Sequence, residues 1–236
     1  MASSTAPIIV WFRQDLRLAD HAALSEAIRR DQPILCVFIL DEDAAGAWPM
    51  GGASRWWLHH SLASLSERLA AIGARLILRR GSAQAILPAL ARETGAGAAL
   101  WNRRYEPPHQ QADAEVKAAL RAAGVAAESF PGALLSEPWT VKTGQGRGFQ
   151  VFTPFWKKLR AELRPAPPIA APAALRSVEG SIVSDALDAW RLTPSSPDWA
   201  TGLRATWTPG EPAAQAALSR FLDEGMADYA DARDRP

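Results

Sequence analysis

Short apolar runs alternate with amphipathic segments over the first 130 residues of the chain. The runs are rich in β-branched and aromatic side chains, which is typical of buried strands. Between them, apolar side chains recur every three or four positions, which predicts helices with one buried face. The predicted strands lie at residues 8–12, 34–40, 75–78, 98–101 and 125–130. This alternation predicts an α/β fold, a five-stranded, parallel, doubly wound sheet of the Rossmann-like kind with flanking helices.

Capping residues set the expected ends of the helices. Asp20, Ser54 and Ser82 each precede an amphipathic segment and carry an oxygen that can accept a hydrogen bond from a free N–H group of the first turn. Prolines at 107–108 suit the first turn of the fourth helix. Gly73 is placed to end the long helix that starts near Ser54, because glycine readily adopts the left-handed conformation found there.

The periodic pattern ends after residue 131. A short helix is expected at 153–163, followed by an extended, Pro/Ala-rich stretch at 164–172. Residues 173–210 show little periodicity, so we expect a connector that crosses the surface of the first domain. The chain is therefore divided into an α/β domain at 1–131, a connector at 132–210 and the start of a further helical region at 211–236.

The last of these regions should begin with a helix at Pro212. Its apolar side chains are expected to face a partner rather than the first domain; they are Leu218, Phe221 and Leu222. Exposed apolar groups of this kind favour association, so we expect the chain on its own to self-associate through this surface.

Composition and charge narrow the function classes. A hydrophobic content of 48% supports a sizeable core, and a net charge of +1 gives no overall electrostatic case for binding nucleic acid or a membrane surface. The single cysteine, Cys36, lies inside an apolar run and is expected to be an inert core residue. No apolar stretch approaches the roughly 20 residues of a membrane span, and no secretory signal is evident, so a cytoplasmic location is expected.

The loop after the first strand carries the most concentrated candidate chemistry. Arg13, Asp15, Arg17 and Asp20 follow that strand, and the loop has no glycine. A dinucleotide site needs glycines there for the backbone to approach pyrophosphate, which argues against an NAD site and against a stand-alone nucleotide-binding domain. Ligands of such sheets bind beyond the carboxyl ends of the strands, so a site is expected among the loops 13–20, 41–53 and 102–108.

Other candidates are weaker. His59 and His60 are adjacent on a helix and point about 100° apart, so they cannot both face one ligand. No spacing of cysteine, histidine or acidic residues indicates a metal site. The glycine-rich stretch 144–148 follows no clear strand and opens no helix, which indicates a flexible loop rather than a phosphate-binding loop.

Several strings along the chain resemble, in order, those of the DNA photolyase and cryptochrome family. The first runs from Val10 to Asp20, and the resemblance continues to a Tyr followed by an Arg-Asp-x-Pro stretch. The other strings are at 52–58, 101–107, 151–157, 209–211 and 229–236. The chain is thereby identified as the N-terminal α/β domain of a class I-like photolyase, expected to stop just inside the flavin-binding domain.

The resemblance implies a light-driven carbon–carbon lyase, a deoxyribodipyrimidine photo-lyase that repairs cyclobutane dimers in UV-damaged DNA. It implies FAD in the helical domain and an antenna chromophore near the α/β domain. A cryptochrome, which signals instead of repairing, is the alternative that residues before the flavin domain do not separate. No catalytic residue is expected within these 236 residues, and the chain alone is expected neither to repair nor to bind DNA specifically.

The resemblance implies an antenna site, and eight residues that converge at one end of the predicted sheet are expected to contact it, while Tyr229 is expected to contribute to an incomplete FAD site. The eight are Arg13, Asp15, Arg17, Leu40, Asp41, Arg55, Asn102 and Glu106. Deazaflavin-using relatives tend to carry an acidic residue between the last two of these, where this chain has Arg103 and Arg104. Methenyltetrahydrofolate, 8-hydroxy-5-deazaflavin and FMN therefore all stay open as the antenna.

Overall fold

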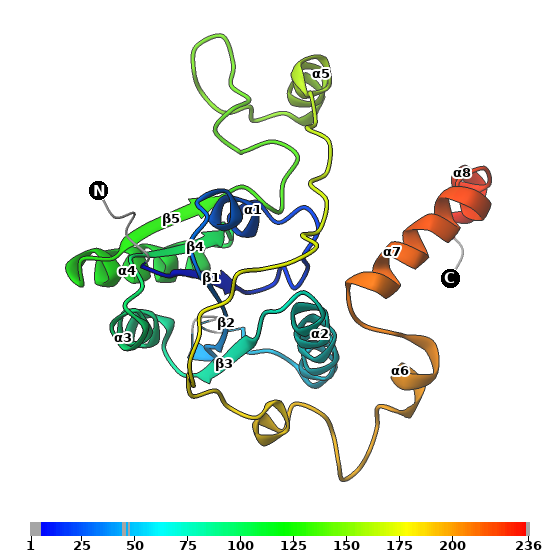
Figure 1. The fold of residues 1–236 in the computed structure, drawn as a ribbon. Coiled ribbons are helices and arrows are strands. Elements are labelled where there is room, and N and C mark those ends of the chain that lie inside the picture. The colour runs from blue at the N-terminus through cyan, green and yellow to red at the C-terminus, as the bar shows by residue number, and fades with distance from the viewer. Residues whose placement is uncertain (1–5, 44–45, 47, 235–236) are drawn as a thin grey trace.

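Five parallel strands form the centre of the protein, in a computed structural model that describes residues 6–43, 46 and 48–234 (Figure 1). Neighbouring strands are ordered β3-β2-β1-β4-β5, and all four pairings are parallel. The strands are β1 (Ile8–Phe12), β2 (Ile34–Leu40), β3 (Leu76–Arg80), β4 (Ala98–Asn102) and β5 (Ala126–Phe130). The predicted α/β sheet is confirmed, and the strand order reverses between β1 and β4, as in other doubly wound sheets.

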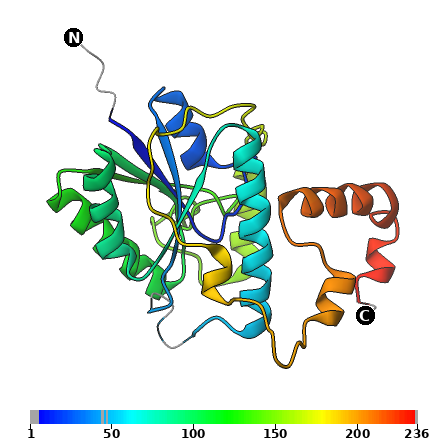
Figure 2. The same cartoon turned by 60° about the horizontal axis from the view of Figure 1, so that its bottom comes forward.

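Helices cover both faces of this sheet. Helices α1 (Ala22–Arg29) and α2 (Gly52–Ala71) pack on the face to which Val10 and Phe12 point, and α3 (Ala83–Thr94) and α4 (Pro107–Ala122) pack on the opposite face. Figure 2 shows the long α2 on one side of the sheet and the green α3 and α4 on the other. Because β1 and β2 are fully buried, their side chains are apolar on both faces instead of alternating with polar ones.

Two of the three predicted helix caps are wrong in position. Asp20 has a φ of 50° and lies just before the cap of α1, which is His21, whose Nδ1 accepts a hydrogen bond from the Leu24 N–H at 3.1 Å. The N-cap of α2 is Gly51 rather than Ser54, so the helix begins earlier than the sequence predicts. At α1 a neighbouring side chain takes the capping role, whereas at α2 the cap residue has no side chain that can accept a hydrogen bond.

The predicted third cap, Ser82, does lie at the N-cap position of α3, but its side chain makes no capping bond. Instead the Asp41 carboxylate, from the loop after β2, accepts a hydrogen bond from the Ala83 N–H at 2.8 Å. Strand β3 also extends to Arg80, beyond the predicted residue 78, because its backbone continues to pair with the end of β2 after its side chains have become polar.

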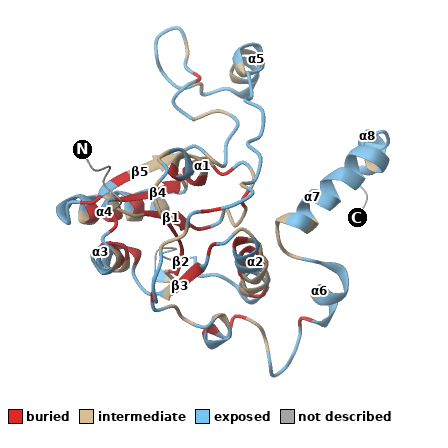
Figure 3. Ribbon diagram, viewed as in Figure 1, coloured by how far each residue is buried: buried red, intermediate tan, exposed pale blue. Residues whose placement is uncertain are grey.

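The connector divides into an exposed and an anchored part. Residues 131–172 contain α5 (Phe152–Glu162), which has no buried residue, close to the predicted helix at 153–163. From residue 173 the chain returns to the core: Leu175 and Trp190 join the cluster under α2, and Ser177 bridges to Ile34 at the start of β2. Figure 3 shows red, buried positions along this anchored part and pale blue along the loop that carries α5.

The last segment lies beside α2 and extends away from the sheet (Figures 1 and 2). It contains α6 (Thr201–Thr206), α7 (Glu211–Arg220), a π-helical turn η3 (Phe221–Gly225) and α8 (Tyr229–Ala232), and none of these elements has a buried residue. The three apolar side chains predicted to face a partner, at 218, 221 and 222, are exposed.

Two further expectations concern the core and the membrane. Cys36 is fully buried in β2, and burial raises the pKa of its thiol to about 12, which confirms an inert core cysteine. Over the part of the chain that the structure describes, no helix combines the length and the apolar character needed to cross a membrane.

Candidate functional site

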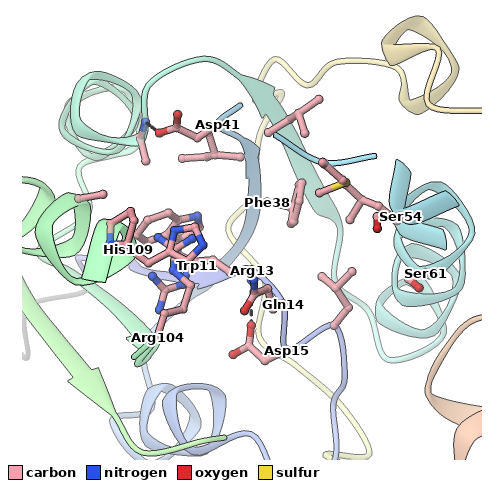
Figure 4. Close-up of a pocket in the computed structure, with 18 of the residues that line it drawn as sticks. Trp11, Arg13, Gln14, Asp15, Phe38, Asp41, Ser54, Ser61, Arg104 and His109 are labelled. Carbon is pink, nitrogen blue, oxygen red and sulfur yellow. Dashed lines mark hydrogen bonds between the residues drawn. The ribbon is translucent and has the colours of Figure 1, made fainter. Parts of the chain in front are cut away.

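The loops at the carboxyl ends of the strands surround a cavity of about 1120 Å³ (Figure 4). It is lined by the end of β1 and the residues after it, by the end of β2 and the loop after it, by the start of α3, and by the first three turns of α4. One side of α2 and the start of α7 complete the wall. The cavity therefore adjoins the point where strand order reverses, which is where ligands of doubly wound sheets bind.

Arg13 is held in the wall of this cavity by buried contacts. Its side chain is 5% exposed, and its Nη1 donates to Asp113 Oδ1 of α4 at 2.6 Å. Its Nη2 donates to the carbonyl of Asn102, and its Cζ lies 4.6 Å from the centre of the Trp11 ring. Burial lowers the pKa of Arg13, and the charge of Asp113 opposes that effect.

Asp15 fastens the loop after β1 to two neighbouring elements. One carboxylate oxygen accepts the Arg13 backbone N–H at 2.8 Å, and the other accepts Asn102 Nδ2 at 2.7 Å and lies 3.0 Å from His21 Nε2. Burial raises the pKa of Asp15, but the hydrogen bonds and charges of His21 and Arg13 outweigh it and hold that pKa well below its usual range. The carboxylate is therefore ionised over the whole physiological range.

Arg17 and Asn102 hold the same loop from the other side. The Arg17 guanidinium donates to backbone carbonyls, among them that of Gly132 at 2.7 Å. Both amide atoms of Asn102 are occupied, since Oδ1 accepts the Ala23 N–H at 3.0 Å and Nδ2 bonds Asp15. Glycine is required at 132, because a Cβ there would lie 2.7 Å from Asn102 Cγ. Asn102 does not line the large cavity but an adjoining pocket of about 90 Å³.

The remaining predicted residues fall into two groups. Leu40 and Asp41 end β2 and line the cavity. Arg55 and Glu106 do not line it: Arg55, at the start of α2, bonds Glu42 and the Met50 carbonyl, and Glu106 is the exposed N-cap residue of α4.

Tyr229 lies apart from the cavity. It is 52% exposed on α8, and its ring lies 5.6 Å from that of Phe221. In the described structure its aromatic contact is within the C-terminal segment itself.

Several cavity residues were missed by the sequence analysis. Trp11, Arg104 and His109 lie together on one side of the cavity, and Phe38 lies apart from them (Figure 4). Trp57 of α2 also lines the cavity. The strand pattern had marked Trp11 as core, and it is indeed 3% exposed, but its edge reaches the cavity. His109 lies in the first turn of α4, directly after the Pro pair at 107–108. The start of this helix at the expected site was the sequence signal available for it.

Other groups offer less chemistry. Within the described residues, no cluster of three or more histidine, cysteine or acidic side chains has the arrangement of a metal site. His59 and His60 lie with their ring centres 5.1 Å apart, and the second packs against Trp56 rather than facing a ligand. The stretch 144–148 is exposed and forms turns.

The protein is a doubly wound α/β domain with a cavity at the carboxyl ends of its strands. The family model described as DNA photolyase matches residues 8–173, and the chain belongs to that family. The family resemblance inferred from the sequence strings is thereby confirmed.

Individual relatives agree with this assignment. The chain is 43% identical to a deoxyribodipyrimidine photo-lyase of Agrobacterium fabrum, over 100% of this chain and 49% of the relative, and 34% identical to Cryptochrome-1 of Arabidopsis thaliana, over 94% of this chain and 32% of the relative. A crystal structure of a bacterial class III photolyase from Agrobacterium tumefaciens superposes with a TM-score of 0.92 at 43% identity, over 99% of this chain and 48% of that one. The chain thus spans about half the length of the curated photo-lyases it matches. The class I-like assignment stays a prediction.

Proposed function

We propose that this chain is the chromophore-binding α/β portion of a deoxyribodipyrimidine photo-lyase, a lyase that splits cyclobutane pyrimidine dimers in UV-damaged DNA with blue light. The observation that carries the proposal is the cavity of about 1120 Å³ at the carboxyl ends of the strands, in a chain of the photolyase family. A cavity of this size accommodates a ligand as large as a folate or a flavin. We also propose that the protein acts in the cytoplasm.

The residues of the cavity suit a planar chromophore with polar edges. Phe38, Trp57 and Leu58 supply apolar surface against which rings can pack, and polar side chains are concentrated on the wall formed by the loop after β1 and by α4. We propose that five of the predicted residues contact the chromophore and that the other three support the loops around it. The five are Arg13, Asp15, Arg17, Leu40 and Asp41, and the three are Arg55, Asn102 and Glu106.

Two cofactors are proposed for the enzyme as a whole. A bound antenna supplies excitation energy, and a bound FAD supplies the electron for dimer cleavage. For the antenna, the chain's own residues exclude water from the rings and orient them through the fixed loop after β1, since Asp15 bonds within that loop and ties it to Asn102 and His21. For FAD, we propose Tyr229 as a contact, with the rest of the FAD site outside the α/β domain.

Chromophore titration tests this proposal. The purified chain is titrated with methenyltetrahydrofolate, 8-hydroxy-5-deazaflavin and FMN, and absorbance and fluorescence are recorded; ATP is the control ligand for a nucleotide-binding domain. We expect saturable binding of at least one chromophore at one site and no comparable binding of ATP. Binding of ATP with none of the three chromophores would overturn the proposal.

A cryptochrome is the second candidate, because Cryptochrome-1 of Arabidopsis thaliana is 34% identical over 94% of this chain. Both functions use the same α/β portion, so antenna binding does not separate them. Light-dependent loss of thymine dimers, measured with a protein that also contains a flavin-binding portion, supports the photo-lyase. Retention of flavin photochemistry without dimer loss supports the cryptochrome.

A further inference from the structure

The first residues of α7 form part of the wall of the large cavity. Gly210 and Ala214, which lie one turn apart, line it together with Glu211. Beyond this turn the segment is mostly exposed, since α7, η3 and α8 have no buried residue. Figure 2 shows the N-terminal end of α7 beside α2 and the remainder extending away from the sheet. One wall of the cavity is therefore the start of a segment that is otherwise open to solvent.

The Glu211 carboxylate attaches this end of α7 to the loop after β1. Its side chain is 7% exposed, and its two oxygens accept the backbone N–H groups of Leu18 at 2.7 Å and Ala19 at 3.0 Å. The same carboxylate pairs with Arg68 of α2. Hydrogen bonds to an ionised carboxylate are among the stronger ones in proteins, and a buried carboxylate needs them. Glu211 is therefore the main attachment of α7 to the α/β domain.

The loop that Glu211 holds is also a wall of the cavity. Residues 13–17 line it, and Leu18 and Ala19 follow them directly in the chain. Leu18 is buried in the core, and the preceding residues are tied to the sheet through Asp15. A displacement of residues 13–17 therefore moves the two N–H groups from which Glu211 accepts. The cavity and the attachment of α7 share this one loop.

The contact at Gly210 gives α7 two distinct states, attached and released. Gly210 has a φ of 116°, and a Cβ there would lie 2.5 Å from Ser64 Oγ of α2. Because the backbone at the start of α7 touches α2 so closely, the attached helix has no room to slide along it. Loss of the Glu211 contacts would instead release the segment as a whole.

We infer that occupation of the large cavity is coupled to the attachment of α7 through Glu211, so that a bound ligand holds residues 211–232 in place. This inference rests on the proposed chromophore function and adds a means of regulation to the same site. The attached state supplies cavity wall that the released state lacks, and a ligand shifts an equilibrium toward the state that it binds more tightly. Such coupling is reciprocal, so a partner that holds α7 in place tightens ligand binding by the same factor.

The coupling transmits the state of the cavity to an exposed apolar surface. Phe221 and Leu222 lie on the same segment, one turn beyond α7, and are 41% and 49% exposed. Their position relative to the α/β domain depends on whether α7 is attached. Occupation of the cavity therefore sets how this surface is presented to a partner.

Hydrogen–deuterium exchange of the full chain, with and without ligand, tests the coupling. The probe is whichever of FMN, methenyltetrahydrofolate and 8-hydroxy-5-deazaflavin binds most tightly, at about 100 times its Kd. A released helix as short as α7 is marginal in water, so its amides exchange whenever it opens. We expect the ligand to slow exchange of residues 214–220 about 5-fold or more. Helix α5, which does not line the cavity, is the internal control and should be unchanged.

Variants of Glu211 test whether this residue carries the coupling. Glu211→Ala should speed exchange of residues 214–220 and remove the protection by ligand, with each variant measured at a ligand concentration that saturates it. Glu211→Gln, which keeps an accepting oxygen, should restore part of the protection. Glu224→Ala on the exposed turn η3 is the matched control and should show the protection of the wild type. Circular dichroism and thermal unfolding confirm that the variants fold.

The outcomes separate this inference from the proposed function. Ligand binding without slower exchange of residues 214–220 would overturn the coupling and leave the chromophore function standing. Protection of equal size in Glu211→Ala would show that Glu211 does not carry the coupling and would also overturn the inference. Absence of binding by every chromophore tested, in the folded wild-type chain, would overturn both.

Discussion

Asp15 is the residue on which the geometry of the loop after β1 depends. It joins that loop to Asn102 at the end of β4 and to His21 at the start of α1 through contacts of 2.7 and 3.0 Å. These partners belong to two separate elements, so loss of the carboxylate would release the loop from the sheet and from α1 together.

The first prediction concerns the pH dependence that follows from Asp15. Its pKa in the folded chain lies below the ordinary value of 3.8, so its stabilising contribution is fully present above about pH 4 and is lost as the pH falls further. Asp15→Asn should lower the free energy of unfolding at pH 7 by about 1–3 kcal/mol and flatten its decline in acid. Urea unfolding at pH 7, 5, 4 and 3 measures both effects.

Asp223→Asn, on the exposed turn η3, is the matched control and should change neither quantity. An Asp15→Asn variant whose stability falls with acid as steeply as that of the wild type would show that Asp15 is not an acid-sensitive anchor.

The sequence predicted only those cavity residues that directly follow a strand or belong to a string shared with the family. Arg13, Leu40 and Asp41 follow strands directly, and they line the cavity. The positions of Arg104 and His109 in the cavity wall depend on how α4 packs against β1. No local sequence pattern encodes this tertiary contact. Strand order brings the loops together, but the side chain that fills each position is decided by packing.

The second prediction separates the two interpretations of Glu106. The family strings predict a chromophore contact, whereas the structure gives Glu106 an exposed N-cap position outside the cavity, where its carboxylate accepts the Tyr105 N–H at 3.1 Å. From the geometry we expect Glu106→Ala to leave chromophore affinity within about 2-fold, since an exposed surface change has small effects. Titration of Glu106→Ala beside Arg104→Gln measures this, and a large loss of affinity in the first variant would restore the sequence interpretation.

At the scale of elements, strands and helices were largely predictable, and their caps were not. The bounds of β1 and β2 agree with the apolar runs because both strands are buried on both faces. By contrast, the first turn of α3 is capped by Asp41, whose carboxylate accepts a hydrogen bond from the Ala83 N–H group, 42 positions later in the chain. Capping by a distant loop carries no local sequence signal, so Ser82 was assigned that role from its type and position alone.

Helix α7 is attached to the α/β domain mainly through Glu211. Its carboxylate, 7% exposed, accepts the N–H groups of Leu18 and Ala19 at 2.7 and 3.0 Å and pairs with Arg68 of α2. Gly210, which precedes it, has a φ of 116°, and a Cβ there would lie 2.5 Å from Ser64 Oγ. The entry to α7 is therefore fixed to the loop that also lines the cavity.

The third prediction follows from that attachment. Glu211→Ala should release α7 and raise the rate of proteolytic cleavage within residues 200–210 about 10-fold, because the loss of buried charged hydrogen bonds is worth about 1–3 kcal/mol of local opening. Mass spectrometry of a time course with a broad protease locates the cuts. Glu224→Ala on η3 is the control, and equal cleavage in both variants would show that Glu211 is not the anchor.

At the scale of the molecule, the connector is held at some places and free at others. Residues 164–172 are mostly exposed, whereas Leu175, Ile182 and Trp190 are buried against the sheet and α2. The sequence predicted an extended linker at 164–172 from its Pro and Ala content. The apolar residues that anchor the following part are isolated and show no helical or strand periodicity, so the sequence pattern did not identify them. Their role became evident only from the surface on which they pack.

The fourth prediction uses this difference. Limited proteolysis of the wild-type chain should cut first within 142–150 or 164–171 and should spare 175–192, because exposed segments with few contacts open at the lowest free energy. The α/β portion and the anchored stretch should then remain associated on gel filtration. Early cuts within 54–71, inside α2, would contradict the packing of that helix on the sheet.

The final prediction concerns what residues 1–236 do on their own. Tyr229 is the proposed FAD contact, and it lies half exposed on α8, away from the large cavity. One aromatic contact cannot offset the entropy lost when a dinucleotide and a chain segment are ordered together. With a net charge of +1 the chain also lacks the excess positive charge with which proteins track phosphates.

We therefore expect the purified 236-residue chain to retain no FAD and to show no light-dependent loss of thymine dimers from irradiated DNA. It should instead self-associate, since Phe152, at 70% exposure, and Phe221 and Leu222 present apolar surface on α5 and η3. Light scattering across a concentration series measures this, and Phe221→Ser should shift the equilibrium toward the monomer. Stoichiometric FAD in the purified chain, or dimer repair by it under blue light, would require the FAD site to form from these residues alone.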